Sequence, residues 1–180
     1  MENTLPQNAG TIDPAKAIES MIEQYGDGLL RLCCLYMGDN TSAEDAWQET
    51  CLQAFRHYGT FRHECSEKTW LTGIAVNVCR SALRREKLRR LHFIPLPDGL
   101  DEEKIPEGDA PDTLFDDTVM QAIRQLAPKY REVILMFYYQ EMKGKEIAEV
   151  LGISESAVTV RLTRARAQLK ESLSDWYYDL

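Results

Sequence analysis

The sequence lacks the features of a membrane or secreted protein. No apolar run approaches the roughly 20 residues that a bilayer-spanning helix needs. The first ten residues carry neither a basic start nor an apolar core, so we expect no signal peptide. The five cysteines form no CxxC pair and are odd in number, which argues against a disulfide framework and favours the reducing cytoplasm.

The sequence motifs of common enzyme classes are also missing. The chain contains no P-loop, no nucleophile elbow and no HExxH sequence. His63, Glu64 and Cys65 share one short segment, but no further ligand stands at a recognised metal spacing. We therefore expect no catalytic residues, no metal and no cofactor. A metal-dependent nuclease built on His63 and Glu64 is an alternative that a cleavage assay would test.

The chain has fewer basic than acidic residues, and the excess of acids is concentrated in one segment. Lys and Arg number 21 against 29 Asp and Glu, which gives a net charge of −8. Nine of the acids lie in residues 93–120 beside a single lysine, and four prolines accompany them. Proline and like charge both oppose a packed helix, so residues 93–117 are predicted to form an extended acidic linker. The near-neutral flanks leave nucleic-acid binding open.

Most of the remaining sequence has the pattern of helices with one buried stripe. Gly26 and Gly28 interrupt the first apolar pattern, which predicts two helices before the first turn. A third helix is expected from Ser42, with Phe55 on its apolar face, and Ser66 is expected to cap a fourth. The predicted fold is all-α, with two small helical domains on either side of the linker.

The second half contains the most informative stretch. A helix opened by Pro128 is expected to bury Phe137 and Tyr138, and residues 145–166 then have the pattern of a helix-turn-helix. A glycine stands at the turn, where a positive φ is needed, and a serine follows as the N-cap of the second helix. The positions that define the motif are Ile147, Ala148, Leu151, Gly152, Ser154, Val158 and Leu162.

The outer face of the second helix of this motif is suited to DNA. Short side chains there can approach base edges in a major groove, while arginines contact phosphates. The expected base-facing residues are Ser156, Thr159, Val160 and Thr163, and the expected phosphate contacts are Arg161, Arg164 and Arg166. No acid lies between Arg161 and Lys170. A solvated basic face on an ordinary helical hairpin would explain the charge but not the combination of turn glycine, cap and core pattern.

Several stretches, in order, resemble bacterial RNA polymerase sigma factors of the extracytoplasmic-function (ECF) group. Ser42–Phe55 and Trp70–Asn77 resemble sigma region 2, and residues 126–135 and 145–166 resemble region 4. The resemblance implies a transcription initiation factor that binds core polymerase and directs it to promoters. It implies a region 2 domain over residues 1–92 and a region 4 domain over residues 118–180.

The resemblance also implies roles for individual residues. Asp45, Gln48 and Glu49 match positions that dock on the β′ clamp helices, and region 4 is expected to contact the β flap. The positions that match recognition and melting of the −10 element are Phe61, Arg62, Trp70, Asn77, Arg80 and Arg84. Extruding a base costs a few kcal/mol, so a stacking ring and a pocket are required. The outer face of the helix-turn-helix matches the −35 contact.

The implied partners are core RNA polymerase, promoter DNA and an anti-sigma factor, with no stable homo-oligomer. The chain is expected in the cytoplasm, where an anti-sigma factor can hold it at the membrane. We hypothesise that the acidic linker imitates nucleic acid in the polymerase cleft and shields the basic helices of the free chain. The alternative is an ordinary helix-turn-helix regulator, which would bind a duplex operator as a dimer without polymerase.

Overall fold

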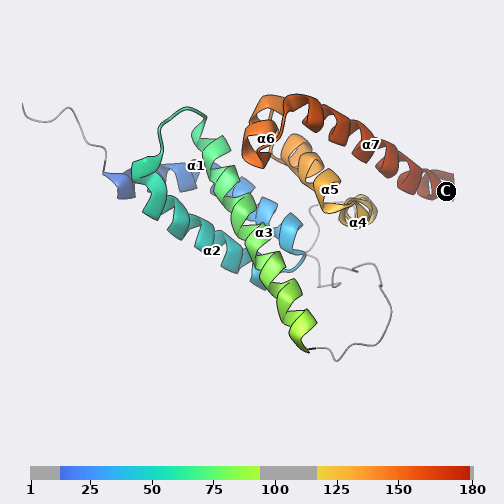
Figure 1. Cartoon of the computed structure of the whole chain (residues 1–180), viewed down its shortest axis with the longest axis horizontal. Coiled ribbons are helices and arrows are strands. Elements are labelled where there is room, and N and C mark those ends of the chain that lie inside the picture. The colour runs from blue at the N-terminus through green and yellow to red at the C-terminus, as the bar shows by residue number, and fades with distance from the viewer. Residues whose placement is uncertain (1–12, 94–116, 179–180) are drawn as a thin grey trace, which may run out of the picture.

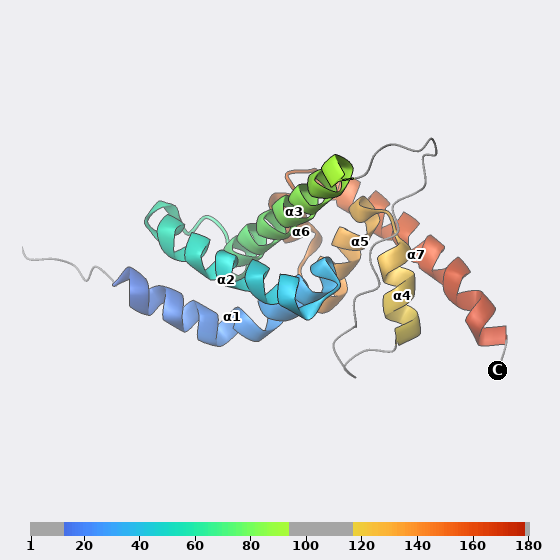
Figure 2. The same ribbon diagram turned by 90° about the horizontal axis from the view of Figure 1, so that it is seen from below.

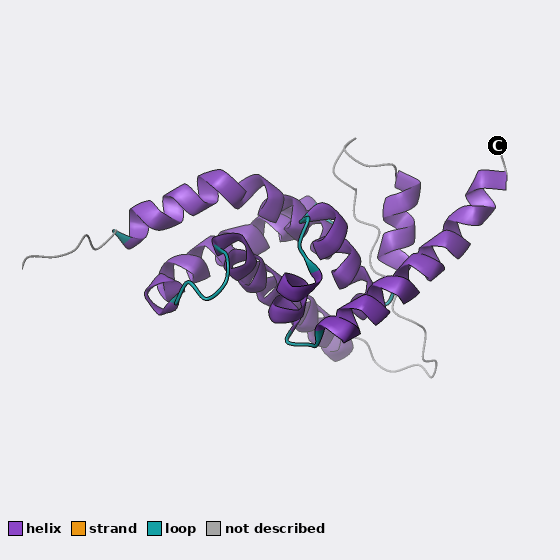
Figure 3. Ribbon diagram, turned by 90° about the horizontal axis from the view of Figure 1, so that it is seen from above, coloured by secondary structure: helices purple, strands orange, loops and turns teal. Residues whose placement is uncertain are grey.

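The computed structural model describes residues 13–93 and 117–178, and every regular element in these ranges is helical (Figure 3). The elements are α1 (Pro14–Met37), α2 (Asn40–His57), the 3-10 turn η1 (Tyr58–Thr60), α3 (Glu67–Phe93), α4 (Asp117–Gln125), α5 (Pro128–Ile134), the π-helical turn η2 (Leu135–Tyr139), α6 (Gly144–Leu151) and α7 (Glu155–Tyr178). The all-α prediction is confirmed. Residues 94–116 of the expected linker and the first ten residues lie outside the described ranges. Within those ranges, no helix is both long and apolar enough to cross a bilayer.

The prediction of two helices before residue 38 is wrong, because α1 runs unbroken for 24 residues through both glycines. A methyl group on Gly26 would lie 3.4 Å from the Trp47 side chain of α2, an ordinary contact distance, so α1 and α2 pack closely at this point. A glycine inside a helix costs about 1 kcal/mol relative to alanine. Burying one side chain such as Met21 or Leu29 contributes about 1.5–3 kcal/mol, which outweighs that cost.

Helices α1, α2 and α3 pack together as the first unit (Figure 1). Helix α2 starts two residues before the expected Ser42, because the Asp39 carboxylate accepts a hydrogen bond from the Ser42 N–H at 2.8 Å and serves as the N-cap. The expected burial of Phe55 is also wrong, since its side chain is 54% exposed. The residue before it, Ala54, lies on the buried stripe, and a step of one residue rotates a side chain about 100° around the helix axis. As expected, Ser66 caps α3, accepting from the Thr69 N–H at 3.1 Å.

Helices α4 to α7 and the turn η2 form the second unit. Pro128 occupies the first turn of α5, where its missing N–H costs nothing. The helix then widens into η2, and the Gln140 N–H donates to the Leu135 carbonyl, five residues back, at 3.1 Å. The wider turn breaks the 3.6-residue spacing, which explains why Tyr138 is 53% exposed although the apolar pattern predicted its burial.

The two units pack against each other, with α6 beside α3 and η2 beside α1 (Figures 1 and 2). Gln140 lies in this interface and is only 3% exposed. Its side-chain amide donates to the Gly28 carbonyl at 2.6 Å, and its own backbone carbonyl accepts a hydrogen bond from Lys68. A buried amide must be satisfied in this way, so Gln140 favours one arrangement of the two units.

Replacing Gly152 tests the backbone at the turn between α6 and α7. Gly152 has φ 65°, in the left-handed region that disfavours a Cβ atom. We expect Gly152→Ala to lower the free energy of unfolding by about 1 kcal/mol in urea denaturation. Gly144→Ala is the control, because Gly144 begins the same helix with open space around it and no positive φ. Equal stability of the two variants would contradict this account of the turn.

Candidate nucleic-acid interface

Helices α6 and α7 form the expected helix-turn-helix. The Gly152 turn is closed by a hydrogen bond from the Ile153 N–H to the Ala148 carbonyl at 3.0 Å. The Ser154 hydroxyl then accepts from the Ala157 N–H at 3.2 Å and caps α7. The buried positions of the motif are Ile147, Ala148, Val158, Leu162 and Ala165. These contacts fix the direction in which α7 leaves the turn, and therefore which of its faces points outward.

The residues predicted to face bases all lie on the exposed side of α7: Ser156, Thr159, Val160 and Thr163. The two threonine hydroxyls donate to carbonyls one turn back, Thr159 to Glu155 at 3.0 Å and Thr163 to Thr159 at 2.9 Å. Their protons are thus committed to the helix. Beside the 48% exposed Val160, this leaves a face of methyl groups suited to thymine methyls.

The three predicted phosphate-contacting arginines are placed differently. Arg164 and Arg166 are exposed and Arg161 is half-buried. The Arg166 Nε donates to the Tyr138 hydroxyl at 2.9 Å, and its guanidinium lies 5.6 Å from the centre of the same ring. This contact holds Arg166 against η2. Sequence reasoning missed Tyr138, because its apolar spacing indicated burial.

In the first unit, two of the predicted −10 residues meet as a ring pair. The Phe61 and Trp70 rings stack with centroids 4.6 Å apart, and the His63 ring is tilted against Phe61 with centroids 4.3 Å apart. Trp70 is half-buried, so it belongs partly to the core and partly to this surface. A shallow pocket of about 260 Å³ opens here, lined by Thr60, Phe61, Arg62, Glu64, Cys65, Trp70 and Glu149.

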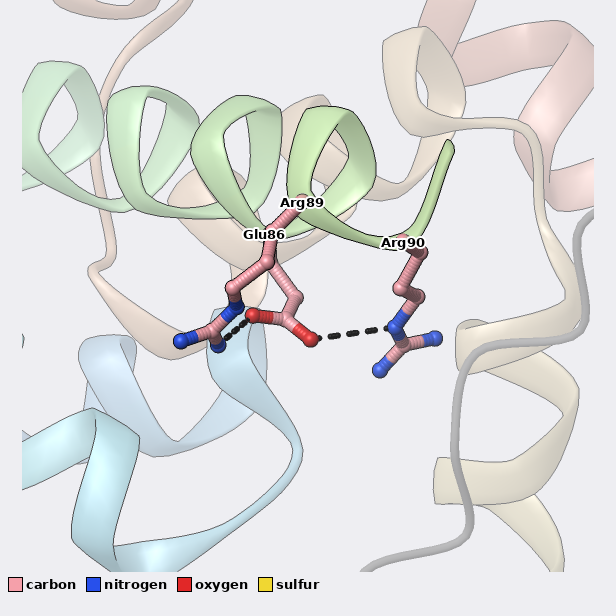
Figure 4. Close-up of polar contacts among 3 residues, drawn as sticks. All are labelled: Glu86, Arg89 and Arg90. Carbon is pink, nitrogen blue, oxygen red and sulfur yellow. Dashed lines mark hydrogen bonds and ion pairs between the residues drawn. The ribbon is translucent and has the colours of Figure 1, made fainter. Parts of the chain in front are cut away.

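The basic end of α3 carries an internal ion-pair network. The Glu86 carboxylate binds both Arg89 and Arg90, the latter at 3.0 Å (Figure 4). These arginines hold the pKa of Glu86 below its ordinary value, so the carboxylate stays charged. Arg84 is exposed, and so is Asn77, which lies about two turns earlier on the same side of α3. Of the predicted −10 residues, these two remain open to a ligand along the helix.

Arg80 is the predicted −10 residue that the structure places elsewhere. Its guanidinium makes two hydrogen bonds of 2.7 Å to the Glu132 carboxylate of α5, in the second unit. The carboxylate raises the pKa of Arg80 further above its ordinary value. Nothing in the sequence pattern pointed to Glu132, because the two residues are far apart along the chain.

The predicted docking face lies on α2. Asp45 and Gln48 are exposed, and the half-buried Glu49 accepts a hydrogen bond from the Gln53 amide at 2.9 Å. Leu52 continues this side of the helix and is 51% exposed. The place of Leu52 on this polar face was visible in the sequence.

The cysteines and acids give no metal site among the described residues. All five cysteines are free thiols. Burial raises the pKa of the Cys65 thiol, and the Glu149 carboxylate beside it raises that pKa further. At neutral pH this thiol is therefore protonated and a poor nucleophile.

Together these surfaces define a class: a two-unit helical protein with a helix-turn-helix in its second unit and a ring pair beside a basic helix in its first. Comparison with protein families gives a match to sigma-70 region 2 over residues 21–89 and to sigma-70 region 4 over residues 116–169. The two matches follow one another along the chain in the order that the sequence predicts.

Individual relatives agree with these matches. The ECF RNA polymerase sigma factor SigM of Mycobacterium tuberculosis is 30% identical over 87% of this chain and 77% of its own length. SigW of Bacillus subtilis is 28% identical over 88% of this chain and 90% of its own length. SigG of Mycobacterium tuberculosis is 32% identical over 82% of this chain, but the chain spans about half of that relative, 46%.

Solved structures show the same fold. The sigma factor RpoE of Bartonella quintana, in complex with the anti-sigma factor NepR, aligns with a TM-score of 0.70 at 19% identity. That alignment covers 88% of this chain and 98% of RpoE. CnrH in complex with the cytosolic domain of CnrY aligns with a TM-score of 0.67 at 24% identity, over 89% of this chain and 90% of CnrH.

The chain belongs to the family of ECF RNA polymerase sigma factors. This assignment confirms the resemblance drawn from the sequence and agrees with the interpretation that the chain is not an enzyme. The family assignment leaves the individual roles of residues on the DNA and docking faces as predictions.

A salt titration tests the phosphate contacts on α7. We expect Arg161→Ala plus Arg164→Ala to reduce the slope of log affinity against log salt by about two for a mixed-sequence duplex, because each lost contact no longer releases counterions. Lys16→Ala plus Arg56→Ala removes the same charge from exposed positions of the first unit and is the control. A slope unchanged from wild type in the α7 variant would show that these arginines do not contact phosphate.

Proposed function

We propose that this chain is an alternative sigma factor that binds core RNA polymerase, recognises and melts the −10 element and binds the −35 element. The observation that carries the proposal is the pairing, in one chain, of a helix-turn-helix with an exposed short-side-chain face and a separate unit bearing stacked rings beside a basic helix. Duplex binding and single-strand capture need these two different surfaces. We assign them to residues 118–180 and 1–92.

For the −35 element, α7 is proposed to enter the major groove. The side chains on its base-facing side are short, so the helix can approach the base edges closely. The exposed Val160 is available for contact with a thymine methyl group. Arg161 and Arg164 flank this side and hold phosphates. Arg166 joins them if its ring contact with Tyr138 persists on DNA, which would aim the guanidinium at one backbone position.

For the −10 element, Phe61 and Trp70 are proposed to act with Arg62 at the rim of the pocket. Stacking on an aromatic ring is worth about 1–3 kcal/mol per base, which offsets the few kcal/mol that unstacking a base costs. Asn77 and Arg84 lie exposed along α3 and are suited to the adjoining strand. Arg80 completes this set only after its ion pair with Glu132 opens.

The α2 face is the proposed contact with core polymerase. Asp45, Gln48 and Glu49 would dock on the β′ clamp helices, with Leu52 supplying the apolar centre that such contacts need. The second unit would contact the β flap. The proposed docking residues and the proposed DNA-contacting residues do not overlap, so core binding and promoter binding use different side chains.

The proposed partners extend to an anti-sigma factor. RpoE of Bartonella quintana was solved in complex with the anti-sigma factor NepR, and CnrH in complex with the cytosolic domain of CnrY. We infer a comparable inhibitor for this chain, which would act in the cytoplasm or at the membrane. We infer no stable homo-oligomer.

Reconstituted transcription tests the proposed function. We expect purified chain added to core RNA polymerase to start RNA synthesis at a limited set of sites on genomic DNA, mapped by sequencing of transcript 5′ ends. Core polymerase alone is the control. A palindromic operator bound tightly by the chain alone, with no new start sites, would instead establish the helix-turn-helix regulator.

The docking face has its own test. We expect Asp45→Ala plus Gln48→Ala to weaken binding to core polymerase by about tenfold or more, as loss of central interface residues does, with unchanged thermal stability. Glu23→Ala plus Gln24→Ala is the control, since both residues are exposed on α1 and the same charge is lost. Equal core affinity of the two double variants, measured by fluorescence anisotropy, would refute the docking assignment.

A further inference from the structure

Acidic side chains of the second unit cover the candidate −10 surface of the first. Glu132 comes from α5, and Glu146 and Glu149 come from α6. Each meets the first unit at a different point: Arg80, Thr69 and the pocket beside Phe61. Carboxylates therefore stand along the surface where the phosphates of a bound strand would lie.

The Arg80–Glu132 pair is the strongest of these contacts. Both hydrogen bonds measure 2.7 Å, the Glu132 side chain is 9% exposed, and that of Arg80 is 35% exposed. Bidentate ion pairs of this kind are short and directional. Breaking this one leaves a nearly buried carboxylate unless water or another cation reaches it, so the pair resists partial opening.

The groups around Glu132 also favour a charged carboxylate at this point of the interface. The neighbouring Arg131 is buried and donates to the Arg124 carbonyl at 3.2 Å, inside the second unit. On the facing side, burial raises the pKa of Tyr36 well above its ordinary value, and the Tyr36 hydroxyl has no hydrogen-bond partner among the described residues. A carboxylate between Arg80 and Arg131 is electrostatically favoured, and only the closed arrangement places it there.

Glu149 acts at the other end of the covered surface. It lines the same pocket as Phe61, Arg62, Cys65 and Trp70, although it belongs to the second unit. A base stacked on the Phe61 and Trp70 rings would need the space in front of this carboxylate, and a strand phosphate would be repelled by it. Beside it, Glu146 accepts a hydrogen bond from the Thr69 hydroxyl at 3.3 Å.

We propose that α5 and α6 form an autoinhibitory latch, in which Glu132 and Glu149 cover the −10 surface of the free chain and exclude single-stranded DNA. The latch rests on the proposed −10 role of the first unit. Opening it releases Arg80 for DNA and uncovers the pocket in one step, because both carboxylates belong to the same unit, where η2 contacts both α5 and α6. A partner that holds the two units apart, as docking on polymerase would, relieves the inhibition.

Alkylation of Cys65 measures opening without any DNA. Cys65 lies in the covered pocket, whereas Glu132 contacts Arg80 at a separate point of the interface. Glu132→Gln therefore changes the reactivity of Cys65 only by opening the interface between the two units. We expect this variant to react with N-ethylmaleimide about five- to tenfold faster at Cys65, by peptide mass spectrometry, in line with the loss of a charged hydrogen-bonded pair. Cys51, on α2, is the internal reference.

Two further variants distinguish opening of the latch from nonspecific destabilisation of the protein. Glu171→Gln removes an exposed carboxylate from the same unit and should leave the rate at Cys65 unchanged. The charge swap Arg80→Glu with Glu132→Arg should restore slow reaction at Cys65, since it restores an ion pair across the interface. A folded Glu132→Gln protein that reacts at the wild-type rate, or a swap that fails to restore protection, would overturn the latch.

DNA binding then tests the inhibition itself. We expect Glu132→Gln and Glu149→Gln each to bind a randomised single-stranded oligonucleotide about five- to tenfold more tightly than wild type, with Glu171→Gln unchanged. Faster Cys65 alkylation without tighter DNA binding would show that the contact opens but does not inhibit. Transcription with core polymerase, measured on the same variants, reports separately on the proposed function.

Discussion

A bidentate ion pair joins α3 to α5 through Arg80 and Glu132, two residues that lie 52 positions apart in the sequence. Around it, the Gln140 amide reaches the Gly28 carbonyl, and Thr69 reaches Glu146. All three contacts are polar and partly buried, so each is stabilising only while the units remain in register. Apolar packing within each unit builds the helices, but these directional contacts determine how the units face each other.

That arrangement leaves the two proposed DNA surfaces differently exposed. The outer side of α7 stays exposed, with Val160 and Arg164 free of the interface. The ring pair of Phe61 and Trp70 lies at the boundary, with Glu149 across from it. The docking side of α2 is exposed as well. In this arrangement the proposed polymerase and duplex-DNA surfaces are exposed, whereas the proposed single-strand surface is partly covered by the second unit.

Local chemistry explains which sequence-based predictions were confirmed. Gly152 adopts the left-handed turn, Ser154 and Ser66 cap their helices, and Val158 and Leu162 are buried, because each outcome depends on a few neighbouring residues. The wrong predictions depended on distant ones. The α1 glycines did not end a helix, because the burial of α1 side chains against other helices outweighs the cost of glycine in a helix.

Two exposed aromatics show the limit of helical periodicity. Phe55 lies one position beyond the buried stripe of α2, and Tyr138 lies where the helix widens to a π turn. A pattern of apolar residues predicts that one side of a helix is buried. It does not fix the rotation of that side to within one residue, because tertiary contacts and the exact helical pitch decide it.

By itself the sequence determined the all-helical class, the helix-turn-helix with its serine cap and turn glycine, and the family. Each of these depends on residues a few positions apart, whose spacing fixes backbone conformation and buried face. Only the tertiary structure decided that Arg80 meets Glu132, that Glu149 faces the Phe61 pocket, and that Gln140 is buried. Contacts between charged and polar groups far apart in sequence leave no periodic pattern, since their energy depends on the distance and burial that folding creates.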